Sequence, residues 1–194
     1  GLMASRFWLT RLENAAKPEW NAWYQLAVAR CAAGYLPAAR EALRQSLARR
    51  DNGWAWSALA DIESIAGNLD AAIEARRKAL APLPENRAIF LRFAQDMIAA
   101  DHPQELLDAI DALHTLRAVP RVKACRVTAL IRLARYDEAR AILLEPLIIP
   151  DMREGELSMS ALWDALHMKE HNIPLEEARA QYPLPYELDF RMHD

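Results

Sequence analysis

Apolar and charged residues alternate with a helical period along residues 67–86. Ile73 and Leu80 place bulky side chains on the apolar face, whereas Ala72 and Ala79, seven residues apart, place almost nothing there. Small residues at helical spacing let a second helix approach closely. The pattern therefore predicts a helix that packs tightly against a neighbouring helix.

Helix-breaking residues recur at regular intervals and cut the chain into predicted helices of roughly ten to sixteen residues. These breaks fall at Pro18, 51–53, Gly67, 82–84, 101–103, Pro120, Pro150 and 172–174. Alternating runs of Val, Ile and Thr, from which strands are built, do not occur. The sequence predicts an all-α protein.

The helical pattern also repeats. The segment that begins at Trp23 returns at Trp56 with an offset of 33 residues. A third copy begins at Phe90, and a fourth closes with residues 134–147. A period of this length indicates a stacked array of two-helix units, in which each unit buries its apolar stripe against the next.

A helix, a turn and a second helix at this period resemble the tetratricopeptide repeat (TPR) family over residues 19–150. In the second copy, Trp56 occupies the signature tryptophan position of the first helix, and Gly67 lies in the turn. Ala72 and Ala79 occupy the two small positions of the second helix. The resemblance implies a right-handed α-solenoid with C-terminal capping helices and a concave side lined by first helices.

The second copy departs from the TPR signature at three positions. Ala60 stands where the signature has glycine, Glu63 where it has tyrosine, and Arg76 where it has a bulky residue of the second helix. For Arg76 we expect the aliphatic stem to lie along the seam between helices, with the charge at its edge.

The repeat register predicts the domain organisation. A last helix of an upstream repeat, or an N-terminal cap, spans residues 1–18. Four TPR-like repeats span 19–52, 53–86, 87–119 and 120–152, and capping helices with an extended tail span 153–194.

The concave side is the expected binding surface. Trp23, Trp56 and Phe90 are expected in the core, whereas Trp54 and Tyr24 fall on the opposite side of their helices. The predicted groove residues are Asn21, Tyr24, Gln25, Trp54, Ser57, Asp61, Arg92, Gln95, Arg121 and Thr128. This mixed polar and aromatic set suits an extended peptide or a protein surface.

The TPR resemblance also bears on the partner. TPR modules that hold a chaperone's terminal carboxylate place Lys and Asn at positions that carry Tyr24, Val28, Ser57 and Asp61 here. We therefore expect another protein or peptide partner and no catalytic activity.

Composition and charge bear on the class of partner and on the cellular compartment. The 194 residues carry a net charge of −3, and arginines alternate with acids, so no nucleic-acid partner is indicated. Charges interrupt every apolar run, and the N-terminus lacks a signal-peptide pattern, so neither a membrane span nor a leader is expected. Cys31 and Cys125, without CxxC spacing, fit buried, reduced thiols in the cytoplasm.

One motif carries metal chemistry. His167–His171 spells H-x-x-E-H, the inverted zinc-protease motif, in which two histidines bind zinc and the glutamate acts as a base. Such enzymes take a third ligand from well downstream, where only 23 residues remain here. The helix also ends directly after the motif, where polar side chains near exposed carbonyls are ordinary. We expect helix-end residues, with no metal, cofactor or catalytic group.

The two ends of the chain give two further expectations. Trp8 and Leu12 form one apolar stripe, which predicts the second helix of an earlier repeat, covered by an upstream domain or by self-association. Near the other end, prolines predict an extended tail whose aromatic and leucine side chains form a lid. The residues of this lid are Tyr182, Tyr186, Leu188 and Phe190.

The ending of the chain, following TPR-like repeats, resembles the C-terminus of large bacterial proteins whose N-terminal part is similar to galactose-mutarotase-like domains. This resemblance implies an alternative function. The chain would be the accessory C-terminal module of a carbohydrate-active protein whose active site lies upstream.

Overall fold

The structure is a computed structural model that describes residue 10, residues 19–145 and residues 158–188. Regular secondary structure in these residues is entirely helical, which confirms the all-α prediction. The chain divides into two compact units, residues 1–96 and residues 97–194. The predicted N-terminal stripe through Trp8 and Leu12 lies outside the described residues.

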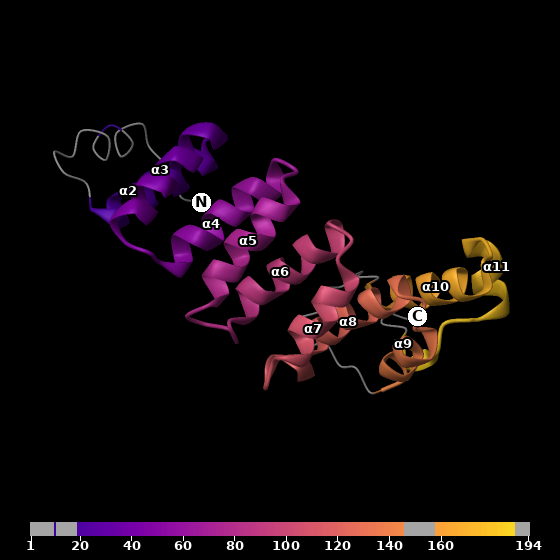
Figure 1. Ribbon diagram of the computed structural model, residues 1–194. Coiled ribbons are helices and arrows are strands. Elements are labelled where there is room, and N and C mark those ends of the chain that lie inside the picture. The colour runs from indigo at the N-terminus through magenta and orange to yellow at the C-terminus, as the bar shows by residue number, and fades with distance from the viewer. Residues whose placement is uncertain (1–9, 11–18, 146–157, 189–194) are drawn as a thin grey trace. The chain divides into compact units, whose positions relative to one another are not determined.

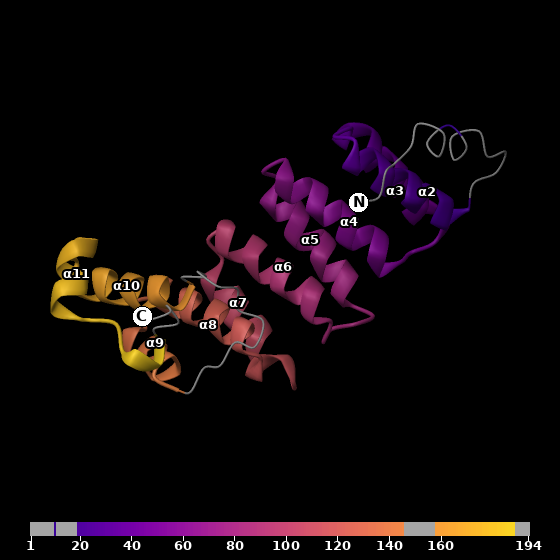
Figure 2. The same ribbon diagram turned by 180° about the vertical axis from the view of Figure 1, so that it is seen from behind.

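The first unit contains two helix pairs that are visible side by side in both views (Figures 1 and 2). Its helices are α2 (Trp20–Ala32), α3 (Leu36–Arg49), α4 (Gly53–Ile65), α5 (Leu69–Leu80) and most of α6 (Arg87–Ala99). In the pairs α2/α3 and α4/α5, a short turn reverses the chain between two helices, as expected for a helical hairpin.

Alanines allow the close packing of these helices. Ala72 and Ala79 are completely buried on α5, as the pattern predicts. The start of α4 approaches the end of α5 so closely that a Cβ atom added to Gly53 would lie 3.0 Å from the backbone oxygen of Ala79. Larger side chains at these positions would push the two helices apart.

A residue with left-handed backbone recurs at the turns after α2, α4, α6 and α8. Gly34 and Gly67 have φ angles of 81° and 79°, and Asp101 and Ala134 follow with 60° and 56°. These four residues are spaced by 33, 34 and 33 positions. The period thus continues into the second unit, although glycine, which adopts this conformation without strain, is lost there.

The aromatic residues at the signature tryptophan position are buried to different extents. Phe90 is buried, as expected, but Trp23 and Trp56 are only half-buried. The Trp56 indole N–H donates to Asp51 Oδ1 at 2.5 Å, and the Lys78 ammonium lies 4.3 Å from the centre of a Trp56 ring. The expectation that both tryptophans are core residues is therefore wrong in degree. Both lie at the edge of the core, where a cation packs over each ring, Lys78 over Trp56 and Arg49 over Trp23.

The second unit contains the remaining helices. They are α7 (Pro103–Asp111), the 3-10 turn η1 (Leu116–Ala118), α8 (Pro120–Arg132), α9 (Tyr136–Leu143), α10 (Ser158–His171), α11 (Leu175–Gln181) and the 3-10 turn η2 (Tyr186–Leu188). Helix α10 packs against α8 and α9. It buries Met159, Trp163 and Leu166.

The predicted aromatic lid forms only in part. Tyr182 stacks on α10, and Leu188 is buried. Tyr186, however, is 81% exposed, so its inclusion in the lid is wrong. Phe190 lies outside the described residues. The described part of the tail is held by the Trp163 indole N–H, which donates to the Tyr182 carbonyl oxygen at 3.0 Å.

Both cysteines are free thiols, but they are half-buried rather than buried. Burial raises the pKa of the Cys125 thiol to about 11, against a smaller opposing effect of Arg121. Burial and the negative charge of Asp61 raise the pKa of Cys31 as well. Among the described residues, no helix has the length and apolar composition needed to cross a membrane.

Candidate functional site

Eight of the ten predicted groove residues lie in the first unit. Asn21, Gln25, Trp54, Arg92 and Gln95 are exposed there. The other three, Tyr24, Ser57 and Asp61, are half-buried, and Tyr24 packs against the core formed by α2, α3 and α4.

The exposed indole of Trp54 stands at one end of a continuous helix face. Trp54 is 61% exposed, and Ser57 and Asp61 follow at i+3 and i+7 on α4. At i+11 the same face ends with Ile65, which is 68% exposed. With a rise of 1.5 Å per residue, the two apolar side chains stand about 16 Å apart along α4.

Beneath this face lies a buried arginine. Arg76 on α5 is only 2% exposed, and its guanidinium donates to both the carbonyl oxygen and Oγ of Ser57, at 2.9 and 3.0 Å. It also donates to Asp61 Oδ1, and its Nε donates to Asp96 Oδ2 at 3.2 Å. The Arg76 charge is therefore not at the edge of the seam, as expected, but inside it, where two carboxylates compensate it.

Asp61 connects the buried charges to the surface. Its Oδ1 also accepts from Arg92 Nη1 at 2.6 Å, and the Arg92 side chain is 58% exposed. Asp96, which is 5% exposed, accepts a further bond from Ser64 Oγ at 2.8 Å. The network holds α4, α5 and α6 together within the first unit and presents one cation at the surface.

The remaining two predicted groove residues lie on α8 in the second unit. Arg121 is half-buried. Thr128 is also half-buried, and its hydroxyl donates to the Ala124 carbonyl oxygen one turn earlier at 3.0 Å. These two residues belong to a different compact unit from the other eight.

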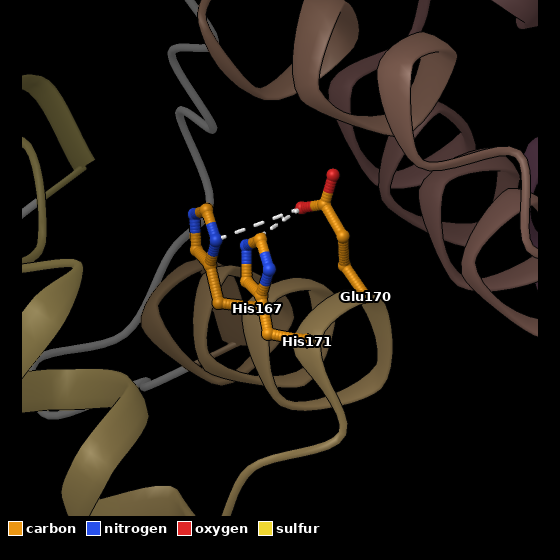
Figure 3. A group of neighbouring side chains, drawn as sticks. All are labelled: His167, Glu170 and His171. Carbon is orange, nitrogen blue, oxygen red and sulfur yellow. Dashed lines mark ion pairs between the residues drawn. The ribbon is translucent and has the colours of Figure 1, made fainter.

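The H-x-x-E-H motif occupies the last turn of α10. Figure 3 shows the His167 and His171 rings side by side on one face of the helix, with the Glu170 carboxylate directed towards them. Glu170 Oε2 lies 3.8 Å from His167 Nδ1 and 3.4 Å from His171 Nε2. The ligand atoms of the three residues all lie within 4.8 Å of one another.

Aromatic rings hold the two histidines in place. The Tyr182 ring is stacked on both, with centroid separations of 4.2 Å to His167 and 4.6 Å to His171. The Trp163 ring meets His167 edge-on at 4.5 Å. The helix-end interpretation therefore fits His171, the last residue of α10, but not His167, which is buried one turn earlier.

Burial and the charge of Arg140 shift the pKa values of two residues of the motif. Burial lowers the pKa of His167, and the nearby Arg140 charge lowers it further. The pKa of Glu170 is lowered because Arg140 Nη2 donates to its Oε2. The cluster thus favours a neutral imidazole beside an ionised carboxylate.

Comparison with known proteins identifies the fold. A solved structure, a TPR-domain containing protein from Parabacteroides distasonis ATCC 8503, matches 93% of this chain with a TM-score of 0.65 and 16% sequence identity. The fold is TPR-like. This chain spans 30% of the length of that protein. No family model matches the sequence, and no curated protein matches it.

The TPR-like fold belongs to the all-α solenoid class. Two features of the site were missed from the sequence: the exposed Ile65 and the partners of two charged side chains. Ile65 repeats the apolar character of Trp54 at i+11, a signal that was readable along the helix face. Two ion pairs had no local signal in the sequence. Arg76 pairs with Asp96, 20 residues away, and Glu170 pairs with Arg140, 30 residues away, and in both cases the partner lies on another helix.

Proposed function

We propose that the chain is a non-catalytic scaffold that binds an extended peptide or a protein surface through the α4 face. This face comprises Trp54, Ser57, Asp61 and Ile65 on α4, together with Arg92 on α6. The observation that carries the proposal is the 61% exposure of the Trp54 indole. Exposed tryptophans next to charged groups are typical centres of protein–protein interfaces.

The α4 face suggests the character of the ligand. Two apolar side chains stand at its ends, and the Asp61–Arg92 pair lies between them at 2.6 Å. An extended peptide advances about 3.3 Å per residue and directs every second side chain to the same side, so apolar side chains four to six residues apart, at an even spacing of about 13 or 20 Å, come nearest to the roughly 16 Å between Trp54 and Ile65. An acidic residue between them would meet the exposed Arg92 guanidinium.

A TPR-like fold also agrees with a scaffold function, because such repeats expose the first helix of each unit. The other candidate, an accessory module of a carbohydrate-active protein, stays a prediction. Sequencing the gene upstream of the codon for Met3 would test it. The cytoplasmic location stays a prediction too.

The test begins with a random peptide display library selected on the full chain, with the Trp54→Ala variant used for counter-selection. Affinities of the selected peptides are then measured by isothermal titration calorimetry. Truncating a central interface tryptophan costs about 2 kcal/mol or more, so Trp54→Ala should weaken binding by about 30-fold or more.

Tyr35 provides the matched control, because it is an aromatic residue of the same unit with almost the same exposure, 62%, but it lies in the α2–α3 turn. Tyr35→Ala should leave the affinity within about twofold, since non-contact surface changes have small effects. Equal losses in both variants, or a selection that yields no peptide dependent on Trp54, would refute the proposed surface.

A further inference from the structure

The last turn of α10 contains a polar side chain with unusual surroundings. His167 is 4% exposed, and among the described residues neither of its ring nitrogens has a hydrogen-bond partner. Buried polar side-chain atoms are normally hydrogen-bonded, so a buried imidazole with two unpaired nitrogens requires an explanation. Metal coordination is one role in which an imidazole nitrogen needs no hydrogen-bond partner.

The neighbouring donors have the spacing that a tetrahedral metal ion needs. With zinc–ligand bonds of 2.0–2.2 Å, two ligand atoms of a tetrahedral site stand about 3.3–3.6 Å apart. The separations from Glu170 Oε2 to His171 Nε2 and His167 Nδ1 are 3.4 and 3.8 Å. The ligand atoms of the two histidines lie within 4.8 Å of each other, so side-chain rotations have to bring the three donors closer together for coordination.

From this geometry we propose that His167, Glu170 and His171 bind one divalent transition-metal ion, with Zn²⁺ as the best-fitting ion. Two imidazole nitrogens and one carboxylate oxygen suit zinc and its neighbours, whereas Mg²⁺ and Ca²⁺ require mostly oxygen ligands. Three protein ligands leave a fourth position for water. The site is a proposal for binding and assigns no reaction.

The surroundings support such a site. The stacked Tyr182 ring restrains the orientation of both imidazoles. Arg140 donates to Glu170 Oε2, so the ion shares this carboxylate with Arg140, and a carboxylate has about four lone-pair positions for such sharing. His171 is at the surface, which gives the ion a path to the buried His167.

This proposal reverses the expectation from the sequence. That expectation was of helix-end residues without a metal, because enzymes with this motif use the glutamate as a base and take a third ligand from well downstream. In the structure the Glu170 carboxylate points towards the histidines and supplies the third donor itself (Figure 3). A downstream ligand is then unnecessary for binding.

The test uses the full chain after dialysis against a chelator, titrated with ZnCl₂ by isothermal titration calorimetry. We expect one Zn²⁺ per chain and no measurable binding of MgCl₂. Glu170→Gln and His171→Ala should each weaken zinc binding by at least about 10- to 100-fold, the loss that altered outer-shell groups already cause. Both residues are only partly buried, so these variants should fold, as circular dichroism would check.

His114→Ala is the matched control, because His114 is an exposed histidine outside α10. This variant should bind zinc with the wild-type affinity. A Co²⁺ titration adds an independent signal, since the strong visible absorption of four-coordinate cobalt should appear in the wild type and disappear in His171→Ala. Wild-type protein that binds no zinc, or that binds it no more tightly than both α10 variants, would overturn the proposal.

Discussion

Replacing the buried Arg76 by methionine should destabilise the first unit strongly. Methionine retains much of the aliphatic volume but removes the guanidinium. Asp96, 5% exposed, then keeps Ser64 Oγ, at 2.8 Å, as its remaining hydrogen-bond partner among the described residues. Asp61 keeps its bond to Arg92 at the surface. The main cost is therefore an uncompensated carboxylate at Asp96.

Removing one partner of a buried ion pair typically costs about 3–5 kcal/mol, because the other charge stays buried without compensation. For a chain of this size, each kcal/mol lowers the melting temperature by about 2–4 °C, so Arg76→Met should lower it by roughly 6–20 °C. The double variant Arg76→Met with Asp96→Met removes both charges. It should be more stable than Arg76→Met alone.

Urea and thermal unfolding followed by circular dichroism would measure these differences. The adjacent Arg77→Met is the matched control, since the Arg77 side chain is 48% exposed and pairs with Glu74 at 3.5 Å. Such surface pairs contribute about 0–1 kcal/mol. The reasoning fails if Arg76→Met costs no more than Arg77→Met, or if the double variant is less stable than Arg76→Met alone.

Two smaller predictions concern a turn and a thiol. Ala134→Gly should stabilise the protein by about 0.5–1 kcal/mol, because the relief of strain in the left-handed backbone exceeds the cost of the entropy that glycine loses on folding. Gly67→Ala should destabilise the protein. If urea unfolding shows that both variants change the free energy of unfolding in the same direction, this account is contradicted. With a pKa of about 11, Cys125 should be only about 0.1% thiolate at pH 8. Its alkylation by iodoacetamide, followed by mass spectrometry, should accelerate about tenfold per pH unit from pH 8 to 10; a rate independent of pH in this range would show that the thiol is not protected.

The repeat architecture was predictable because its determinants are local and periodic. Ala72 and Ala79 mark a close helix contact through their size alone, and both are completely buried. Gly67 marks the turn through its backbone freedom. At Ala134 the same turn forms without glycine, and only the register of the repeat indicates it.

The polar interior was less predictable, because its pairs join residues that are distant in sequence. The departures at Glu63 and Arg76 are visible in the sequence, but their compensation is not. Glu63 is buried and accepts from Arg40 of α3 at 2.9 Å, as Arg76 pairs with Asp96 of α6. Such pairs depend on which helices become neighbours, a property of the assembled fold.

Contacts with residues outside the helix also limited the prediction at the H-x-x-E-H motif. The spacing places His167 and His171 on one helix face, as observed. The burial of His167 depends on Tyr182, which follows α11 directly and stacks on α10 because the chain turns between these two helices. A pattern confined to one helix contains no information about that cover.

The most direct test of the scaffold proposal is hydroxyl-radical footprinting of the full chain with and without a selected peptide. The oxidation rate of the Trp54 side chain reports whether the ligand covers it. We predict that saturation with the peptide lowers this rate several-fold, while the rates of the exposed Tyr35 and Tyr186 stay the same. An unchanged oxidation rate at Trp54 under saturating peptide would contradict the assignment of the α4 face as the binding surface.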